Sequence, residues 1–389
     1  MESHISADGG AGDDTFNIPA SARDSRITII TGLGRNTVNI GSAAGVLPAT
    51  GGITDDVLGS IEITATRKDA LNVDDTATLS AKVWTFGANT LTDGTFTLTH
   101  RGLGAQKLFL GSGSDSIIIG GTSSAVTEVY GNAGDDIFDL QATGATTFIR
   151  LEGGSGVNTL NAGVSITRLS GIKGGVAYFG SGADAFNADD SGRRAINTGA
   201  LSAGDGTQSE PINLSGFGMN ILGITATGIA GVNIKLGGGA DTLTINNTPS
   251  VPVSIDTGAG NDIVKVHATR GALNIALGEG NDIVKFGSSL ALTGNTPSFV
   301  LGPVTLDGGT NLKDRDILDV NASGLSGSIG ELTTTTLTGI GFIQPVNYSA
   351  FESVKILLGL GDDTFTLGPG TGDYTTLRPG PGINTIIRL

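Results

Sequence analysis

The sequence predicts an all-β protein, an elongated parallel β-solenoid with rungs of about 20–22 residues and inserted extra strands. Three observations lead to this prediction. Gly and Pro make up about 19% of the 389 residues, against ~12% in an average protein, and few Gly-free stretches could hold a long helix. A short acidic turn recurs along the whole chain. After each turn apolar and polar residues alternate, which is typical of a β-strand with one buried face.

The recurring turn closes with an acidic or amide residue. The closing residues are Asp14, Asn36, Asp69, Asp115, Asp136, Asn158, Asp184, Asp241, Asp262, Asp282, Asp316, Asp363 and Asn384. The residue two positions later is always apolar, and we expect this series to fill the core. It comprises Phe16, Val38, Leu71, Ile117, Phe138, Leu160, Phe186, Leu243, Val264, Val284, Leu318, Phe365 and Ile386.

The spacing of the turns defines two levels of repeat. The short spacings of 20 to 22 residues fit one rung of two strands and two turns. Longer spacings follow DALNVDD at 69–75, DAFNADD at 184–190 and the weaker copy DILDVNA at 316–322. They predict super-repeats at roughly 60–183, 184–315 and 316–389, the last one partial, with extra strands or hairpins in the long spacings. We expect one continuous domain over 1–389.

Composition narrows the class of protein. The formal net charge of −15 disfavours binding to nucleic acid or anionic lipid. No run approaches the 18 apolar residues of a membrane span, and MESHISADGG resembles no secretory signal peptide. The chain has no Cys and only three His, which leaves little for thiol chemistry or a His-based site. The absence of Cys and the low charge suit a protein exposed outside the cell.

Most turns have the form Gly-x-Gly-x-Asp, as in Gly258, Gly260 and Asp262. Gly adopts the positive φ of tight turns and allows neighbouring backbones to approach closely. Such turns direct carbonyl oxygens toward the next turn, and an added carboxylate would create the hard oxygen site that Ca²⁺ prefers. Stacked Asp residues would also repel one another without a cation between them.

These turns resemble the haemolysin-type calcium-binding repeats, the RTX family with the motif GGxGxDxUx. GGAGDDTFN at 9–17 and GNAGDDIFD at 131–139 are the segments most similar to it. The resemblance implies a parallel β-roll with Ca²⁺ between stacked turns. The side-chain ligands that it implies are Asp14, Asp115, Asp136, Asp184, Asp241, Asp262, Asp282 and Asp363. The DALNVDD units also resemble the repetitive modules of very large bacterial surface proteins.

The chain departs from that family in several ways. The family repeats every nine residues with acidic turns on both edges, whereas this chain has one acidic turn per rung. The leading Gly is replaced in several turns, by Leu110, Leu236, Thr257, Leu277 and Leu358. Asn36, Asn158 and Asn384 lack the carboxylate.

A second hypothesis is that the closing residues only cap turns and bond one another as ladders. Calcium is expected chiefly at 241/262/282 and 115/136, where Asp-bearing turns are one rung apart. One residue of each Asp-Asp pair is predicted to be a solvated turn charge and not a ligand. These are Asp13, Asp74, Asp135, Asp190 and Asp362.

Two other functions have weaker support in the sequence. Parallel β-helices host polysaccharide-acting enzymes, but the chain has one Trp, four Tyr and no evident basic cluster except Arg193–Arg194. An ice- or crystal-binding face would use outward Thr and Asn files such as Thr37-x-Asn39, which Asp139, Lys265 and Lys285 interrupt.

The sequence therefore predicts a non-enzymatic extracellular or cell-surface protein, a Ca²⁺-stabilised solenoid in a stalk, adhesin, surface layer or fibre. Because the chain starts and stops in mid-repeat, we expect its partners to be copies of itself end to end or the rest of a larger repeat protein. A free-standing calcium-binding module is the alternative.

Overall fold

The computed structural model describes residues 3–41, 51–204, 210–287, 296–309, 313–372 and 374–389. These residues form 33 strands and no helix, and most strand pairs are parallel, so the all-β prediction is confirmed. None of them belongs to a helix that is long and apolar enough to cross a membrane. The chain divides into two compact units, residues 1–187 with 218–229 and residues 188–217 with 230–389.

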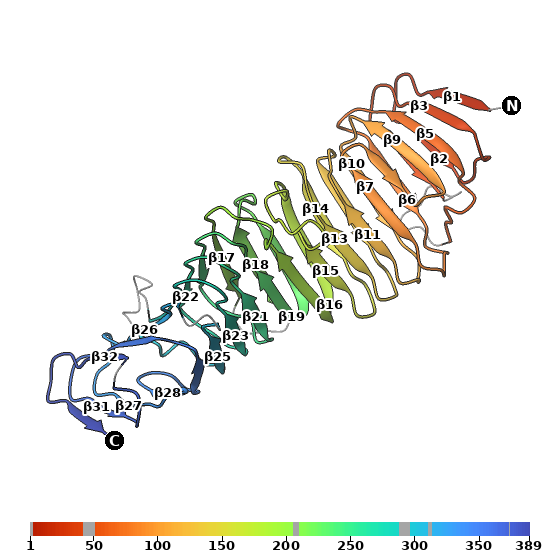
Figure 1. Cartoon of the computed structure of the whole chain (residues 1–389). Coiled ribbons are helices and arrows are strands. Elements are labelled where there is room, and N and C mark those ends of the chain that lie inside the picture. Colours follow the sequence, from red (N-terminus) through yellow and green to blue (C-terminus); the bar gives the residue numbers. More distant parts are fainter. Residues whose placement is uncertain (1–2, 42–50, 205–209, 288–295, 310–312, 373) are drawn as a thin grey trace. The chain divides into compact units, whose positions relative to one another are not determined.

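The first unit contains three parallel ladders (Figure 1). Ladder A consists of β1 (His4–Asp8), β3 (Arg26–Ile30), β5 (Gly59–Thr64) and β9 (Phe96–Arg101). Ladder B consists of β2 (Thr15–Ile18), β4 (Thr37–Ile40), β6 (Ala70–Asp74), β10 (Ala105–Phe109), β12 (Val126–Tyr130), β14 (Phe148–Glu152) and the first residues of β16 (Gly175–Asp189). Ladder C consists of β7 (Val83–Gly87), β11 (Ser116–Ile119), β13 (Ile137–Leu140) and β15 (Thr159–Ala162).

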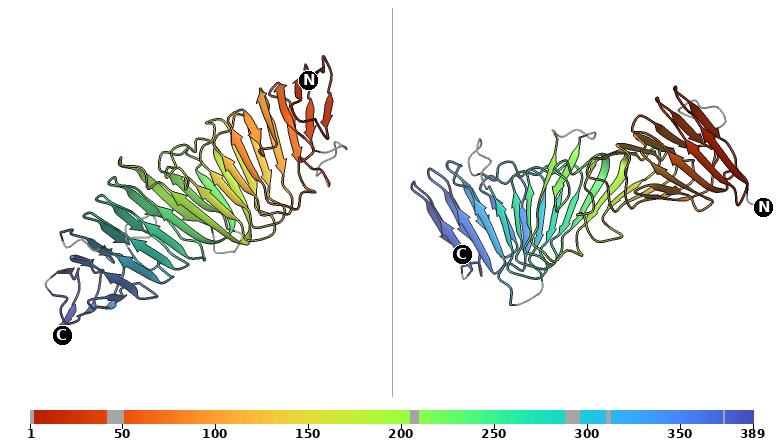
Figure 2. Two further views of the ribbon diagram at one scale, coloured as in Figure 1. Left: turned by 45° about the vertical axis from the view of Figure 1, so that its right-hand side comes forward. Right: turned by 90° about the horizontal axis from the view of Figure 1, so that it is seen from above.

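The second unit has the same kind of construction, and Figure 2 shows its parallel strands from two further directions. Ladder D consists of the end of β19 (Ile224–Lys235), β21 (Val253–Asp256), β23 (Leu273–Ala276), β25 (Val304–Asp307) and β29 (Val346–Ser349). Ladder E consists of β17 (Thr198–Ala203), β20 (Thr242–Ile245), β22 (Ile263–Val266), β24 (Ile283–Phe286), β26 (Ile317–Asn321), β30 (Ser353–Leu357) and β32 (Thr375–Arg378). Ladder F consists of β27 (Ile329–Leu332), β31 (Thr364–Leu367) and β33 (Thr385–Arg388).

The expected extra strands lie in the long spacings. β8 (Thr90–Thr92) pairs antiparallel with β7 and β9 in the first unit. In the second unit β18 (Ile212–Gly216) pairs antiparallel with β17, and β28 (Thr336–Gly339) pairs antiparallel with β27 and β29. The prediction of inserted hairpins is confirmed.

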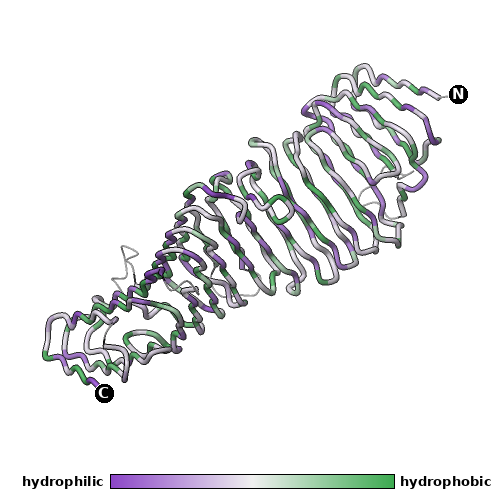
Figure 3. Tube along the Cα trace, viewed as in Figure 1, coloured by the Kyte–Doolittle hydropathy of each residue, from purple (hydrophilic) through white to green (hydrophobic). Residues whose placement is uncertain are grey.

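The register of the core is also confirmed. Eleven of the thirteen apolar residues that follow the turns are fully buried, and Phe16 and Ile386, at the first and last turns, are half-buried. The stacked partners Leu243, Val264 and Val284 show the arrangement, because each lies opposite the next in ladder E. Alternating hydropathy along the strands reflects this division into inner and outer side chains (Figure 3).

One feature of the ladders was not expected from the sequence. In ladder B the strands β2, β4 and β6 follow an acidic turn, but β10, β12 and β14 precede one. Ladder E changes in the same way between β26 and β30. The change follows the segments 69–75 and 316–322, where an additional turn introduces another strand. The super-repeat therefore moves the acidic turn to a different corner.

Candidate metal sites at the acidic turns

The closing residues of the turns form stacks that are held by one repeated hydrogen bond. In each stack the backbone N–H of one residue donates to the side-chain oxygen Oδ1 of the next, as from Asp262 to Asp282 over 2.7 Å. The first unit holds the stacks Asp14–Asn36–Asp69 and Asp115–Asp136–Asn158–Asp184. The second unit holds Asp241–Asp262–Asp282–Asp316 and Asp363–Asn384. The Asx ladders expected from the capping hypothesis are therefore present.

The sequence suggested one continuous series of turns, but the closing residues form several separate stacks. Asp115, Asp241 and Asp363 each begin a stack at a new corner, where they accept the N–H groups of Lys82, Asn197 and Ser328. These three donors lack the Gly-x-Gly-x-Asp pattern, so the repeat did not reveal them. The neighbours expected at 115/136 and 241/262/282 are adjacent, as predicted.

The glycines of the turn are required by the close stacking. Gly280 has a φ of 140°, and a Cβ there would lie 1.7 Å from the carbonyl oxygen of Gly260. Only Gly fits this backbone conformation and this approach. The second Gly of the motif therefore permits this close approach of successive turns.

The five residues of Asp-Asp pairs that were expected to be solvated behave in two ways. Asp13, Asp135 and Asp362 are exposed, as predicted, and each accepts a backbone N–H from the next turn. The prediction of solvated charges is wrong for Asp74 and Asp190, which are 1% exposed. They follow strands of the long repeats, where Thr76 donates to Asp74 and Asn197 donates to Asp190.

The second carboxylate oxygen differs from the first, because in many turns it has no partner. Oδ2 is buried and makes no hydrogen bond in Asp14, Asp136, Asp262, Asp282 and Asp363. A buried carboxylate oxygen without a partner is unfavourable unless a proton or a cation neutralises it. These oxygens are the strongest observation in favour of an ion at the turns.

Burial affects the protonation of the same groups. Desolvation, reinforced by the neighbouring carboxylates, raises the pKa of Asp136 and of Asp282 to about 7. It raises the pKa of Asp262 and of Asp316 to about 6. The pKa values of Asp115 and Asp241 are also raised, mainly by burial. Near neutral pH a proton and a cation therefore compete for the carboxylates of Asp136, Asp262, Asp282 and Asp316.

The last residues of two stacks are satisfied instead. Asp184 accepts the Tyr178 hydroxyl at 2.7 Å on Oδ2 and the Ser181 hydroxyl at 2.8 Å on Oδ1. Asp69 accepts hydrogen bonds from Thr31, Thr66 and Asn36. Burial opposes the charged form of Asp69, but these bonds outweigh it and lower the pKa. Asp184 consequently has the least need of an ion among the predicted ligands.

Two turns bring a carbonyl oxygen close to the unpaired carboxylate oxygen. Beside Gly131, the position of a missing Cβ lies 2.4 Å from Asp136 Oδ2 and 2.4 Å from the carbonyl oxygen of Gly153. Beside Gly9, it lies 2.8 Å from Asp14 Oδ2 and 2.3 Å from the carbonyl oxygen of Thr31. Hard oxygen donors of these two kinds are those that Ca²⁺ prefers.

Five of the other predicted calcium ligands lie in turns without the leading Gly. At Asp115, Asp241, Asp262, Asp282 and Asp363 the leading Gly is replaced by a buried side chain. Asp316, absent from the predicted ligands, also has Oδ2 beside a leading glycine, Gly308. In the described part of the chain no three His, Asp or Glu side chains are grouped closely enough to hold a metal ion. Any calcium at these turns would therefore depend on backbone carbonyl oxygens.

Two features of the structure bear on the alternative functions, a polysaccharide-acting enzyme and an ice- or crystal-binding face. Phe109 and Tyr130 stack on the outer side of ladder B with ring centroids 4.8 Å apart, and Arg150 lies over Phe179. Phe109 is buried, whereas Phe179 is 37% exposed. Asn39 of the expected outward file is buried, and it forms an amide ladder with Asn17 and Asn72.

No protein-family model matches the chain, and no curated protein matches its sequence.

Proposed function

We propose that this protein is a non-enzymatic, extracellular β-solenoid whose corners are stabilised by stacked Asx residues and by bound Ca²⁺. The observation that carries the proposal is that the two oxygens of a stacked carboxylate such as Asp136 differ in their partners. Oδ1 of Asp136 accepts the N–H of Asp115, while Oδ2 is buried without a partner. One oxygen thus connects adjacent turns, and the other is available to a cation.

The preferred calcium ligands are the carboxylates of Asp14 and Asp136, with the carbonyl oxygens of Thr31 and Gly153. Asp262 and Asp282 are the next candidates, because their Oδ2 atoms are buried and unpaired. When bound, Ca²⁺ would neutralise these carboxylates and oppose their protonation. Because only the folded chain brings the donors together, binding would stabilise the fold.

A calorimetric titration with Ca²⁺ tests this proposal. The variant Asp136→Asn removes one charge in a position that Asn36 and Asn158 already occupy in their stacks. We expect it to lose one binding event. The matched control Asp135→Asn removes a charge from the exposed neighbouring residue and should bind like the parent protein. Equal calcium binding by all three proteins would contradict the assignment.

We further propose that the ladders are extended by other strands, from copies of this chain end to end or from a larger repeat protein. In the described residues β1 pairs with β3 alone, and β33 pairs with β31 alone. Unpaired strand edges are templates for additional strands. Electron microscopy of the purified chain with Ca²⁺ should show filaments, and particles that remain single at high concentration would contradict self-assembly.

A further inference from the structure

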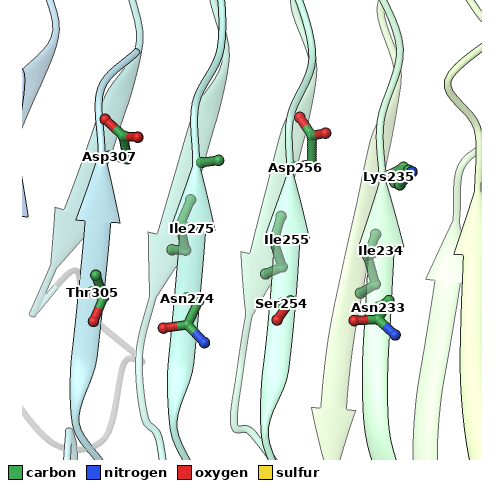
Figure 4. A pocket seen from close by; sticks show the side chains of 11 residues that line it. Asn233, Ile234, Lys235, Ser254, Ile255, Asp256, Asn274, Ile275, Thr305 and Asp307 are labelled. Atoms are coloured by element: carbon green, nitrogen blue, oxygen red, sulfur yellow. The ribbon is translucent and has the colours of Figure 1, made fainter.

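The outer face of ladder D carries a row of charged side chains that form no ion pair within the described residues, although Asp256 and Asp307 each accept a backbone N–H. The row consists of Lys235, Asp256, Ala276, Asp307 and Ser349, which lie opposite one another in successive strands. Asp256 and Asp307 are exposed and two strands apart, and in the described residues neither forms an ion pair. They border a shallow depression of about 380 Å³ (Figure 4). We name this set the Asp row.

The outer face of ladder E carries a row of the opposite sign. It consists of Lys265, Lys285, Asp319, Lys355 and Thr376, again in direct register. Lys265 and Lys285 are immediate neighbours, an arrangement in which like charges repel. No ion pair involves any of the three lysines within the described residues. We name this set the Lys row.

The two rows match because parallel ladders share one spacing of ~4.8 Å between strands. Lys285 and Lys355 are two strands apart, like Asp256 and Asp307. When the rows run in opposite directions, Asp256 faces Lys355 and Asp307 faces Lys285. The same register places the small Ala276 against Asp319. It also sets Ser349 against Lys265 and Lys235 against Thr376, so no like charges meet.

We propose that the Asp row of one copy of this chain docks against the Lys row of a second copy, in the antiparallel register. The occupant is a second copy because the same chain supplies both complementary rows at the same spacing. The contact joins two different surfaces, so each docked copy leaves one row free and association continues sideways. This lateral contact is separate from the end-to-end extension proposed above.

Charge-swap variants test the contact by sedimentation velocity in about 20 mM and about 0.5 M salt. We expect the parent protein to associate at low salt and to dissociate at high salt. Lys285→Glu with Lys355→Glu makes both rows acidic, and Asp256→Lys with Asp307→Lys makes both rows basic. Each variant alone should associate ~10-fold more weakly or not at all, and an equimolar mixture should associate again.

Two controls keep the result interpretable. Arg67→Glu with Lys68→Glu makes the same charge change at exposed residues of the first unit and should associate like the parent. Thermal midpoints of all variants should agree with the parent, because the exchanged side chains lie on the outer faces. A mixture that stays as dissociated as its components, or a parent protein that is monomeric at low salt, would overturn the proposal. Filaments that persist in every variant would report end-to-end assembly alone.

Discussion

The stack Asp115–Asp136–Asn158–Asp184 in the first unit and the stack Asp241–Asp262–Asp282–Asp316 in the second use the same backbone hydrogen bond but manage charge differently. In the first stack, neutral Asn158 separates Asp136 from Asp184, and Tyr178 and Ser181 donate to the last carboxylate. The second stack has four consecutive carboxylates. Its last member, Asp316, donates its N–H to the exposed Glu352. The comparison shows that each stack needs only an Oδ1 atom that accepts the backbone N–H. The negative charge shared with Oδ2 must be offset by other groups.

The largest expected effect comes from removing the acceptor in the second stack. Asp262→Leu leaves the N–H of Asp241 without its partner in a buried turn, although it also removes a charge. We expect a loss of about 2–3 kcal/mol in the free energy of unfolding. Denaturant unfolding measures this loss. Unchanged stability would show that the ladder bond does not hold the corner.

Replacing carboxylates by amides should have the opposite effect and increase the free energy of unfolding. The folded-state pKa values of Asp262 and Asp282, about 6 and about 7, lie above the ordinary value. A raised pKa contributes stability at pH below about 4, and this stability is lost as the pH rises through 6–7. Asn keeps the acceptor and does not titrate. Asp262→Asn with Asp282→Asn should therefore stabilise the calcium-free protein at pH 8, on the order of 1 kcal/mol per site after solvent screening.

The matched change in the first stack sharpens the comparison. Asp136→Asn should give a gain at pH 8 like that of one site of the second stack, because the pKa of Asp136 is also raised, to about 7. Asp184→Asn should give no gain, because Tyr178 and Ser181 already satisfy its carboxylate. Thermal unfolding in EDTA at pH 8 compares the two variants. A larger gain for Asp184→Asn would contradict this account of charge.

The smallest expected effect comes from the Tyr178 hydroxyl. Tyr178→Phe removes the hydrogen bond to Asp184 Oδ2 and makes this carboxylate resemble Asp136. We expect a destabilisation of about 1 kcal/mol. Thermal unfolding in EDTA at pH 8 measures this loss. Unchanged stability would contradict the role given to this hydrogen bond.

Much of this fold could be predicted because two local signals repeat. The alternation after each turn placed residues such as Val264 and Val284 inside, and the 20–22-residue spacing placed Asp262 next to Asp282. The change of corner was not predicted. It depends on Lys82, Asn197 and Ser328, which join the stacks through their backbone N–H groups and share no side-chain chemistry.

The candidate metal sites were only partly predictable, because they too depend on residues that are distant in the sequence. The sequence identified the carboxylates, but the fate of each Oδ2 depends on neighbours in space. Tyr178 satisfies Asp184, whereas Asp136 Oδ2 has no donor and lies close to the backbone of Gly131. The burial of Asp74 and Asp190 was not predicted, because it depends on residues distant in the sequence, such as Gly52 beside Asp74.

The central claim is that a proton or a calcium ion must neutralise the second oxygen of the stacked carboxylates. The most direct test is the thermal midpoint of the parent protein at pH 5 and pH 8, each in EDTA and in excess Ca²⁺. In EDTA the midpoint should be higher at pH 5, where the carboxyl groups whose pKa is raised are protonated. Calcium should raise the midpoint at pH 8 and have little effect at pH 5. A midpoint in EDTA that is higher at pH 8 and insensitive to calcium would contradict the account.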